Sequence, residues 1–303
     1  NYISYRAIKI AKKYSKKVFL TAHDVSLINP GKIFIKNKNH IPRVSFREKL
    51  RKEKKRYNPL REIAIKHYLK YVDKIFCVSN SLRELLRINK IKNTTTIYNG
   101  INVRKWKISL KEIERFKKKH NLINKKVLIF TGRLIEAKGG DELLKSLGIV
   151  DKAFSNWRLL VVGKEWAYTE KLKKIASKLK IKDKIIFTGF LNRKEIKTAY
   201  NSADISVFPS LCFETFGMSN LEAMACKKPV VSTCFGGPQE VVEDNKTGYL
   251  MDPRESSLMA KKILSLFKNP KKQESFGESG YNRAAKVFSL SKQVKKTIGW
   301  YEK

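Results

Sequence analysis

The sequence predicts an α/β fold made of two doubly wound domains with parallel sheets. Short runs rich in Val, Ile and Phe alternate with amphipathic helical stretches along almost all of the 303 residues, which is typical of parallel βαβ units whose strands are buried on both faces. Hydrophobic residues make up 42% of the chain, as in an ordinary globular protein. A polar, charged stretch near 104–124 separates a first group of strands from a second, and we expect a domain boundary there.

The secondary structure can be assigned in order along the chain. A strand is expected where a short β-branched or aromatic run is bounded by turn residues, and a helix where apolar residues recur every three or four positions. Asn192 and Ser256 are suitable helix N-caps because their side chains can accept a hydrogen bond from a first-turn amide. The expected strands are 18–21, 74–78, 95–98, 126–131, 158–162, 184–188, 205–209, 229–232 and 248–251, and the clearest helices are 8–17, 141–153, 169–179, 193–201, 218–226 and 258–267.

The strands divide unequally between the two expected domains. About six strand–helix units lie downstream of the charged stretch, enough for a complete doubly wound domain. Upstream there are only three strands, and a complete domain would need about three more units of roughly 30 residues each. We therefore expect the N-terminal domain to be incomplete. The expected domains are 1–110 and 111–285, followed by a last helix at 286–303 that crosses back to the first domain.

Composition excludes several classes of protein. No stretch approaches 18 consecutive apolar residues, so no transmembrane helix is expected. The four cysteines form no CxxC pair and have no histidine cluster beside them, which favours free thiols over a structural zinc site.

The formal net charge of +39 is the most unusual global property. Basic chains attract phosphates on nucleic acid, lipid or nucleotide, but a lysine bias of the genome would produce the same excess. No specific nucleic acid partner is expected, because no nucleic-acid-binding motif is present. Residues 43–56 hold eight basic and two acidic side chains. This segment is either an amphipathic helix on an anionic membrane or a solvated face.

A first candidate site follows the strand that ends at Thr131. Gly132 allows the backbone to turn, Arg133 and Lys138 follow, and Gly139 precedes a helix. Strand-to-helix turns at the carboxyl end of a parallel sheet bind ligands, and helix N-termini favour anions. The two cations would suit a diphosphate, but taken alone they are better interpreted as surface cations, because Arg and Lys occur throughout this basic chain.

A second candidate site lies in residues 208–225, the least charged stretch of the chain. Glu214 falls in a loop after a strand, and Glu222 falls about one turn into the next helix. Both carboxylates could face one pocket, with the backbone N–H groups at the helix start, and ionised carboxylates accept hydrogen bonds from sugar hydroxyls. Taken alone, Glu222 is better interpreted as a helix-surface residue, and only this context favours a role in a site. A third element at 233–250 contains paired glycines, which indicate a tight turn beside a ligand or another backbone.

Together, the order and spacing of these elements resemble glycosyltransferase family 4, the retaining GT-B enzymes, over roughly residues 18–300. The resemblance extends to Thr21-Ala-His23-Asp24, to 78–81 and to 97–102. It implies a GT-B fold, in which two Rossmann-like, doubly wound parallel-sheet domains face each other across a cleft. It also implies hexosyl transfer from a nucleotide-diphosphate sugar without a metal or other cofactor.

The resemblance also implies roles for individual residues. Arg133 and Lys138 would stabilise the diphosphate as it leaves, Glu214 would hold the donor sugar and Glu222 the ribose. His23 would reach the sugar from the other domain, and no protein nucleophile is assigned. The catalytic set implied is His23, Arg133, Lys138 and Glu214, and the donor-binding set is Gly132, Gly163, Phe190, Leu191, Phe216, Gly217, Met218, Ser219 and Glu222.

The partners implied are a nucleotide-sugar donor and a lipid-linked or polysaccharide acceptor in cell-envelope glycan synthesis, with a cytoplasmic location at the membrane face. The family's Gly-rich loop after the first strand would lie upstream of Asn1, so we expect a fragment of a longer protein or a split gene. One alternative is an inactive remnant that binds anionic membrane or other polyanions, with an affinity that collapses as salt rises. A GT-B epimerase or phosphorylase is a further alternative, against which the spacing of the two glutamates argues.

Overall fold

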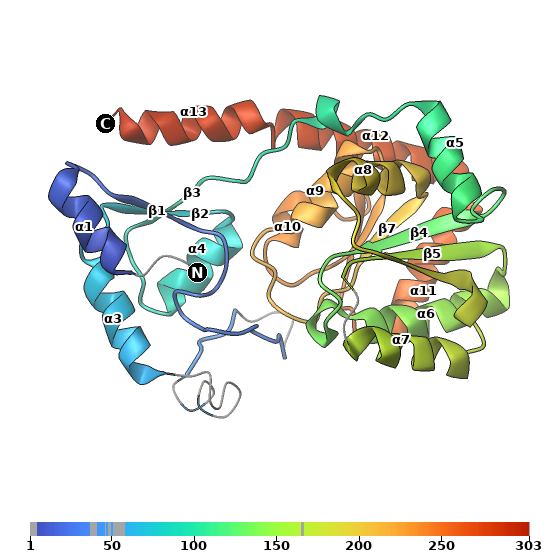
Figure 1. Cartoon of the computed structure of the whole chain (residues 1–303), viewed down its shortest axis with the longest axis horizontal. Helices are drawn as coiled ribbons and strands as arrows, with labels where there is room; N and C mark the ends of the chain where they lie inside the picture. Colours follow the sequence, from blue (N-terminus) through green and yellow to red (C-terminus); the bar gives the residue numbers. More distant parts are fainter. Residues whose placement is uncertain are drawn as a thin grey trace.

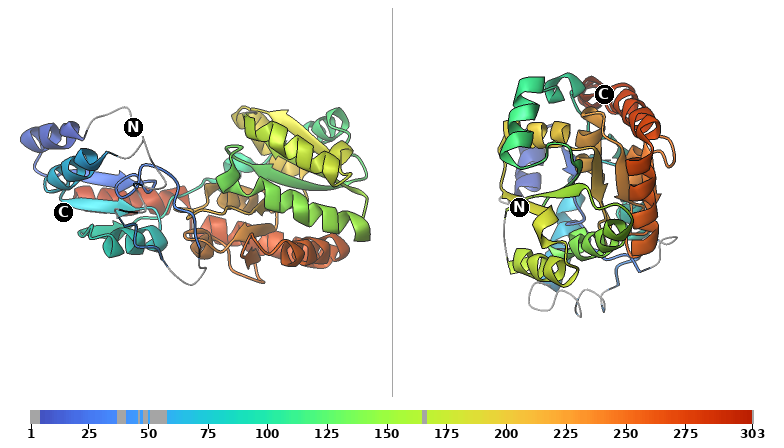
Figure 2. Two further views of the ribbon diagram at one scale, coloured as in Figure 1. Left: turned by 90° about the horizontal axis from the view of Figure 1, so that it is seen from below. Right: turned by 90° about the vertical axis from the view of Figure 1, so that its right-hand side faces the viewer.

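The computed structural model describes residues 5–36, 41–45, 47, 50, 58–164 and 167–302. It contains two parallel sheets, one in each half of the chain. Figures 1 and 2 show these halves at opposite ends of an elongated molecule, and the last helix (red) returns from the C-terminal half to lie over the N-terminal half. Most of the basic segment 43–56 lies outside the described residues, so the structure does not distinguish an amphipathic helix on an anionic membrane from a solvated face.

All nine predicted strands are present within one or two residues of their predicted ends. Every pairing between them is parallel. The N-terminal sheet has the order β1-β2-β3, with β1 at Phe19–Ala22, β2 at Lys74–Cys77 and β3 at Thr94–Thr96. The C-terminal sheet has the order β6-β5-β4-β7-β8-β9, with β4 at Lys126–Thr131, β5 at Trp157–Val162, β6 at Ile185–Gly189, β7 at Ile205–Phe208, β8 at Val230–Thr233 and β9 at Gly248–Met251.

Helices connect the strands in both halves. No helix within the described ranges is long and apolar enough to cross a membrane. In the N-terminal half they are α1 (Arg6–Tyr14), α3 (Pro59–Leu69) and α4 (Asn80–Ile88). The rest are α5 (Leu110–Lys119), α6 (Gly140–Ala153), α7 (Ala167–Lys178), α8 (Arg193–Ser202), α9 (Met218–Ala225), α10 (Pro238–Val241), α11 (Ser256–Lys268), α12 (Pro270–Lys286) and α13 (Leu290–Tyr301), with short 3₁₀ turns η2 (Val103–Trp106), η3 (Glu136–Lys138) and η4 (Lys182–Lys184).

One of the two predicted N-caps is confirmed and the other is wrong. Asn192 accepts hydrogen bonds from two first-turn amides of α8 and forms a capping box with Glu195. Ser256 is instead the first residue of α11, and Glu255 stands at the N-cap position, where its side chain makes no capping hydrogen bond to the helix. The physical reason is a turn closed by the Glu255 N–H and the Asp252 carbonyl, which leads the chain into the helix one residue early. The first helix is also displaced: it spans Arg6–Tyr14 rather than 8–17 because the backbone is already extended at residue 15.

The C-terminal sheet is covered on both faces. Helices α6, α7 and α11 pack together on one face, and α5, α8, α9 and α12 lie on the other (Figure 1). The second of these layers belongs to a hydrophobic core that is continuous with the N-terminal half, where Cys77 and Leu85 join the same cluster as Phe216 and Phe235. The two halves therefore share one core.

The strand order changes direction at one place in the C-terminal sheet. From β4 the chain proceeds outward through β5 and β6, and from β7 it proceeds outward the opposite way through β8 and β9. Between β4 and β7 the crossovers diverge, which leaves a crevice at the carboxyl ends of the strands. A ligand site is therefore expected there.

Candidate functional site

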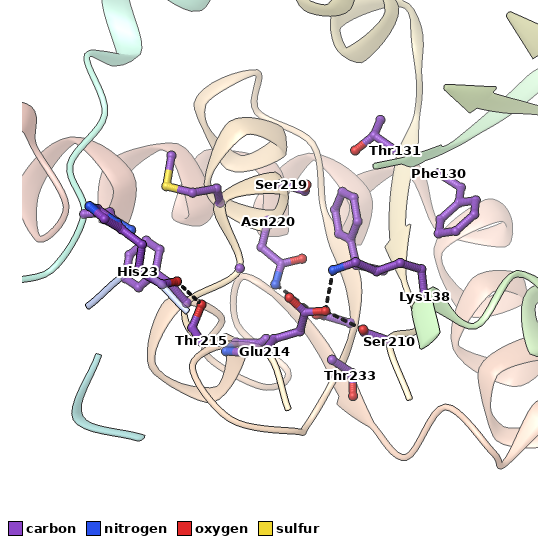
Figure 3. A pocket seen from close by; sticks show the side chains of 17 residues that line it. His23, Phe130, Thr131, Lys138, Ser210, Glu214, Thr215, Ser219, Asn220 and Thr233 are labelled. Atoms are coloured by element: carbon purple, nitrogen blue, oxygen red, sulfur yellow. Dashed lines mark hydrogen bonds and ion pairs between the residues drawn. The ribbon is translucent and has the colours of Figure 1, made fainter. Parts of the chain in front are cut away.

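A pocket of about 330 Å³ lies at this change of direction, where the carboxyl ends of β4, β7 and β8 meet the start of α9. Figure 3 shows the side chains that converge on it. Of the residues predicted from the sequence, the pocket brings together His23, Lys138, Glu214, Phe216, Gly217, Met218 and Ser219.

Gly217 turns the backbone so that α9 begins at the pocket. This residue stands at the N-cap with φ +95°, a conformation that other residues rarely adopt. The amides of Met218 and Ser219 belong to the first helical turn, where N–H groups have no intrahelical acceptor. The Asn220 side chain donates to the Ser232 hydroxyl of β8 (2.9 Å) and so ties α9 to the sheet. This arrangement favours an anion in the pocket.

Glu214 and Lys138 form an ion pair in the pocket wall. The Lys138 ammonium lies 2.5 Å from Glu214 Oε1, and the Ser210 hydroxyl donates to the same oxygen. Burial alone would raise the pKa of Glu214, but the charge of Lys138 and the hydrogen bonds from Lys138 and Ser210 outweigh it and lower that pKa below its ordinary value. Glu214 is therefore a carboxylate that retains acceptor capacity for hydroxyl groups.

The turn that carries Lys138 is held rigidly against the chain after β7. The Ala137 carbonyl accepts hydrogen bonds from the Leu211 N–H (2.9 Å) and the Ser210 hydroxyl (3.0 Å). Gly139 has φ +72°, and a Cβ there would lie 1.9 Å from the Pro209 carbonyl oxygen. Only glycine fits, so this position fixes how closely the Lys138 turn approaches the Glu214 segment.

His23 enters the pocket from the N-terminal half. It follows β1 and is exposed, and its backbone carbonyl accepts a hydrogen bond from the Thr215 hydroxyl (2.8 Å). The Ser79 hydroxyl donates to the Thr215 carbonyl (2.5 Å). Thr215 is therefore held by the N-terminal half through both its side chain and its backbone, immediately beside Glu214.

Arg133 lines a second cavity rather than the first. This cavity has a volume of about 590 Å³ and shares His23, Glu214 and Thr215 with the first pocket. Arg133 is exposed and has no side-chain partner among the described residues. The two predicted cations thus lie in adjoining cavities that share Glu214 as a common wall.

Four more predicted residues gather along the neighbouring edge of β4, β5 and β6. The Gly163 N–H donates to the Gly189 carbonyl (3.1 Å), and a Cβ at Gly163 would lie 2.2 Å from the Gly132 carbonyl oxygen. Phe190 follows directly and is 79% exposed. Gly132, Gly163, Phe190 and Leu191 therefore form a continuous edge outside the described lining of the pocket.

Glu222 also lies outside that lining. Its Oε2 accepts a hydrogen bond from the Tyr200 hydroxyl (3.2 Å), which lies 2.7 Å from the Thr131 hydroxyl in the pocket wall. Burial raises the pKa of Glu222 to about 7, against the opposing effects of Tyr200 and of Arg193, which begins α8 beside Leu191. The two glutamates therefore occupy separate environments: Glu214 is paired with Lys138, whereas Glu222 is bonded to Tyr200 and feels the charge of Arg193.

Some pocket residues were not singled out from the sequence. Ser210, Thr215 and Asn99 line the pocket, and all three fall inside the motif-bearing stretches 208–225 and 97–102. Their contacts depend on the packing of the two halves, which spacing alone does not reveal. Within the part of the chain that the structure describes, no three His, Cys, Asp or Glu side chains gather as a metal site.

The chain is similar in sequence to known glycosyltransferases. The model of glycosyl transferases group 1 matches residues 112–283, and that of glycosyltransferase family 4 matches residues 2–105. The uncharacterized glycosyltransferase MJ1607 of Methanocaldococcus jannaschii is 31% identical over 61% of this chain and 48% of its own length. The capsular polysaccharide biosynthesis glycosyltransferase CapM of Staphylococcus aureus is 28% identical over 71% of this chain and 57% of its own. The chain thus spans about half the length of these relatives.

A solved structure supports the same fold. The Anabaena protein Alr3699/HepE, crystallised with UDP and glucose, superposes with a TM-score of 0.79 at 21% identity, over 99% of this chain and 76% of that one. The expected GT-B arrangement of two parallel-sheet halves is confirmed. With a family model matched over more than half of its residues, the chain belongs to the glycosyl transferases group 1, as its resemblance to glycosyltransferase family 4 predicted.

Proposed function

We propose that the pocket holds a nucleotide-diphosphate sugar, and that the protein to which this chain belongs transfers the hexosyl group to a glycan or lipid-linked acceptor with retention of configuration. The observation that carries the proposal is the partly buried Glu214–Lys138 pair beside the open amides of α9, at the carboxyl edge of a parallel sheet. A carboxylate for hydroxyl groups and an anion-binding helix start in one pocket match the two ends of such a donor.

Most of the catalytic stabilisation would act on the leaving group, the nucleoside diphosphate. The bond between the sugar C1 and the diphosphate oxygen breaks, the acceptor oxygen bonds to C1, and the acceptor proton is released with the nucleoside diphosphate. Lys138, the amides of Met218 and Ser219, and a swing of the exposed Arg133 would stabilise the charge that develops on the departing phosphate. These groups would supply that stabilisation without a metal ion or other cofactor.

The sugar and the nucleoside would occupy opposite ends of the site. Glu214 would accept hydrogen bonds from the hexosyl hydroxyls, and His23 would approach the sugar from the N-terminal half on the face where the acceptor attacks. Glu222 and the edge formed by Gly163, Phe190 and Leu191 would hold the ribose and base. No covalent intermediate is assigned to Glu214, because its ion pair with Lys138 reduces its nucleophilicity.

The proposal also includes the class of acceptor and the place in the cell where the transfer occurs. The name of CapM places that relative in capsular polysaccharide biosynthesis, which favours a polysaccharide or lipid-linked acceptor in envelope synthesis. We propose that the protein acts at the cytoplasmic face of an anionic membrane, where its net charge of +39 would favour contact with the lipid headgroups.

A thermal-shift panel with UDP, GDP, ADP and their sugar conjugates tests the donor site. A ligand at 100 times its dissociation constant stabilises the folded state by about 2.7 kcal/mol, so one nucleotide should raise the melting temperature selectively, with or without EDTA. Arg133→Ala and Glu222→Ala should weaken that shift. Arg115→Ala, which removes an exposed arginine on α5, is the matched control and should retain it.

The alternative function, non-specific binding of polyanions, predicts a different set of thermal shifts. A remnant that binds polyanions non-specifically would give similar shifts with every polyphosphate, and these would fade as salt rises. Such shifts would persist in Arg133→Ala, because one charge among 66 basic residues matters little. That result would reject the donor-site proposal.

A further inference from the structure

A cavity of about 590 Å³ lies beside the donor pocket. Its walls come from the loop after β1, the turn after β4 and the segment 213–215. Because it shares His23, Glu214 and Thr215 with the donor pocket, any molecule in it would lie next to the bound sugar. Its volume falls within the range of small-molecule sites.

The loop that forms one wall is fixed by both halves of the molecule. The Phe213 N–H donates to the Ile33 carbonyl (2.7 Å), and the Ile35 N–H donates to the Leu211 carbonyl (3.2 Å). Ile33 and Ile35 are buried on either side of this pairing. Lys32 precedes Ile33 directly, so its backbone is positioned against the Glu214 segment rather than left on a free surface loop.

Two cations, Lys32 and Arg133, line this cavity. Neither Lys32 nor Arg133 forms an ion pair or side-chain hydrogen bond with another described residue. The charge of Lys32 acts on Glu214, whose own ion pair is with Lys138 outside this cavity. Asp24 is the other acid in the lining, and its Oδ1 already accepts the Ser26 N–H (2.8 Å). The cavity therefore offers an excess of positive charge beside the donor sugar.

We propose that this cavity binds the acceptor, and that Lys32 and Arg133 select an acceptor that carries an oxyanion, either a sugar phosphate or a uronic acid, close to the reacting hydroxyl. This inference rests on the proposed function, because it takes the neighbouring pocket to hold the donor. Lys32 is the specificity-determining residue, since the proposed function also assigns Arg133 to the donor diphosphate. His23 and Asp24 remain available for the neutral hydroxyls of the acceptor.

Calorimetric titration of the 1–303 chain saturated with UDP tests this inference. The probes are methyl α-glucuronide, glucose 6-phosphate and the neutral methyl α-glucoside, at low ionic strength. At least one acidic probe should bind about tenfold more tightly than the neutral glycoside, as expected for one charge-assisted contact. The probe that gains the affinity identifies the oxyanion as carboxylate or phosphate.

Two lysine variants separate the cavity from the general charge of the protein. Lys32→Ala should abolish the preference for the acidic probe and change the UDP affinity less than about threefold, because Lys32 does not line the donor pocket. Lys36→Ala removes an equal charge from the same loop outside the cavity and should leave the preference intact.

Two results would overturn the inference: equal binding of acidic and neutral probes, or equal effects of the two lysine variants. If UDP itself fails to bind, the proposed function loses its support. The same comparison of probes and variants without nucleotide then still decides whether the cavity selects an oxyanion.

Discussion

Glu214 and Glu222 differ in protonation because their neighbours differ. Glu214 has a direct cationic partner and a hydroxyl donor on one oxygen, which lower its pKa. Glu222 is partly buried, with a single tyrosine hydroxyl bonded to it and only a more distant cation, and desolvation raises its pKa to about 7. Identical side chains eight positions apart thus form a stable carboxylate and a group that titrates near neutral pH.

Glu222 should make stability depend on pH. Its pKa is 4.5 in the reference state and about 7 in the folded state, so between these values the folded protein binds a proton that the unfolded chain does not. This contribution is complete below pH 4.5 and is lost as pH rises through 7; one pKa unit is worth about 1.4 kcal/mol, so it is on the order of 3 kcal/mol. Urea denaturation of the wild type and Glu222→Gln at pH 5 and pH 8 should show the wild type losing more unfolding free energy than the variant.

The control for this prediction is Glu274→Gln. Glu274 is exposed and lies on α12, so the variant should retain the wild-type difference between pH 5 and pH 8. A Glu222→Gln variant with the same pH dependence as the wild type would show that Glu222 is ionised throughout this range.

At the scale of elements, α10 caps a helix of the opposite half. The Glu240 carboxylate accepts hydrogen bonds from the Asn80 N–H (2.8 Å), the Ser81 N–H (2.7 Å) and the Ser81 hydroxyl (2.6 Å), at the start of α4. A carboxylate at a helix N-terminus satisfies first-turn amides and interacts favourably with the helix dipole. The contact therefore stabilises α4 and joins the two halves beside the pocket.

Removing this cap should destabilise the molecule more than removing an ordinary surface carboxylate. Glu240→Ala leaves two amides without their acceptor and should lower the unfolding free energy by about 2 kcal/mol. Glu84→Ala on the same helix removes only an exposed ion pair with Arg87, with an expected loss of about 0.5 kcal/mol. Urea denaturation measures both, and hydrogen exchange at Asn80 and Ser81 should accelerate only in Glu240→Ala. Equal losses in the two variants would mean that the cap contributes nothing beyond a surface charge.

The sequence was sufficient for the elements but not for contacts between them. Eight of the strands contain a short apolar run, and β3 is a run of β-branched threonines; both patterns favour strands, and for that reason all nine were predictable. The Glu214 loop was also predictable, because the motif that contains it is local. Glu240 and Lys32 carried no such signal: each acts on residues more than a hundred positions away, and each is one charge in a strongly charged chain.

At the scale of the whole molecule, the two halves are joined by two chain crossings that lie side by side. The segment after β3 meets the segment before α13 through hydrogen bonds from the Ile101 N–H to the Phe288 carbonyl (2.8 Å) and from the Leu290 N–H to the Ile101 carbonyl (3.1 Å). Beyond this point, α13 places Trp300 against Phe19 and Phe76 of the N-terminal sheet. The relative position of the halves, and so the closure of the pocket between them, depends on this paired crossing (Figure 1).

Gly100 allows the two crossings to approach each other, and replacing it should loosen the junction. A Cβ at this position would lie 2.6 Å from Leu290 Cα and 2.8 Å from the Ser289 carbonyl oxygen, both backbone atoms. Gly100→Ala should therefore force the crossings apart and lower the unfolding free energy by about 1–3 kcal/mol. It should also weaken nucleotide-sugar binding, because the preceding residue, Asn99, lines the pocket.

Gly299→Ala is the matched control, since a Cβ there meets no atom within 4 Å and the position lies inside α13. Alanine in a helix interior should stabilise the protein by up to about 1 kcal/mol, so the two substitutions should act in opposite directions. Urea denaturation measures the stabilities, and limited proteolysis around residues 97–106 reports whether the junction has opened. If Gly100→Ala is as stable and as protease-resistant as the wild type, the close contact at Gly100 does not hold the halves together, and closure of the pocket depends instead on Ser79, Thr215 and Glu240.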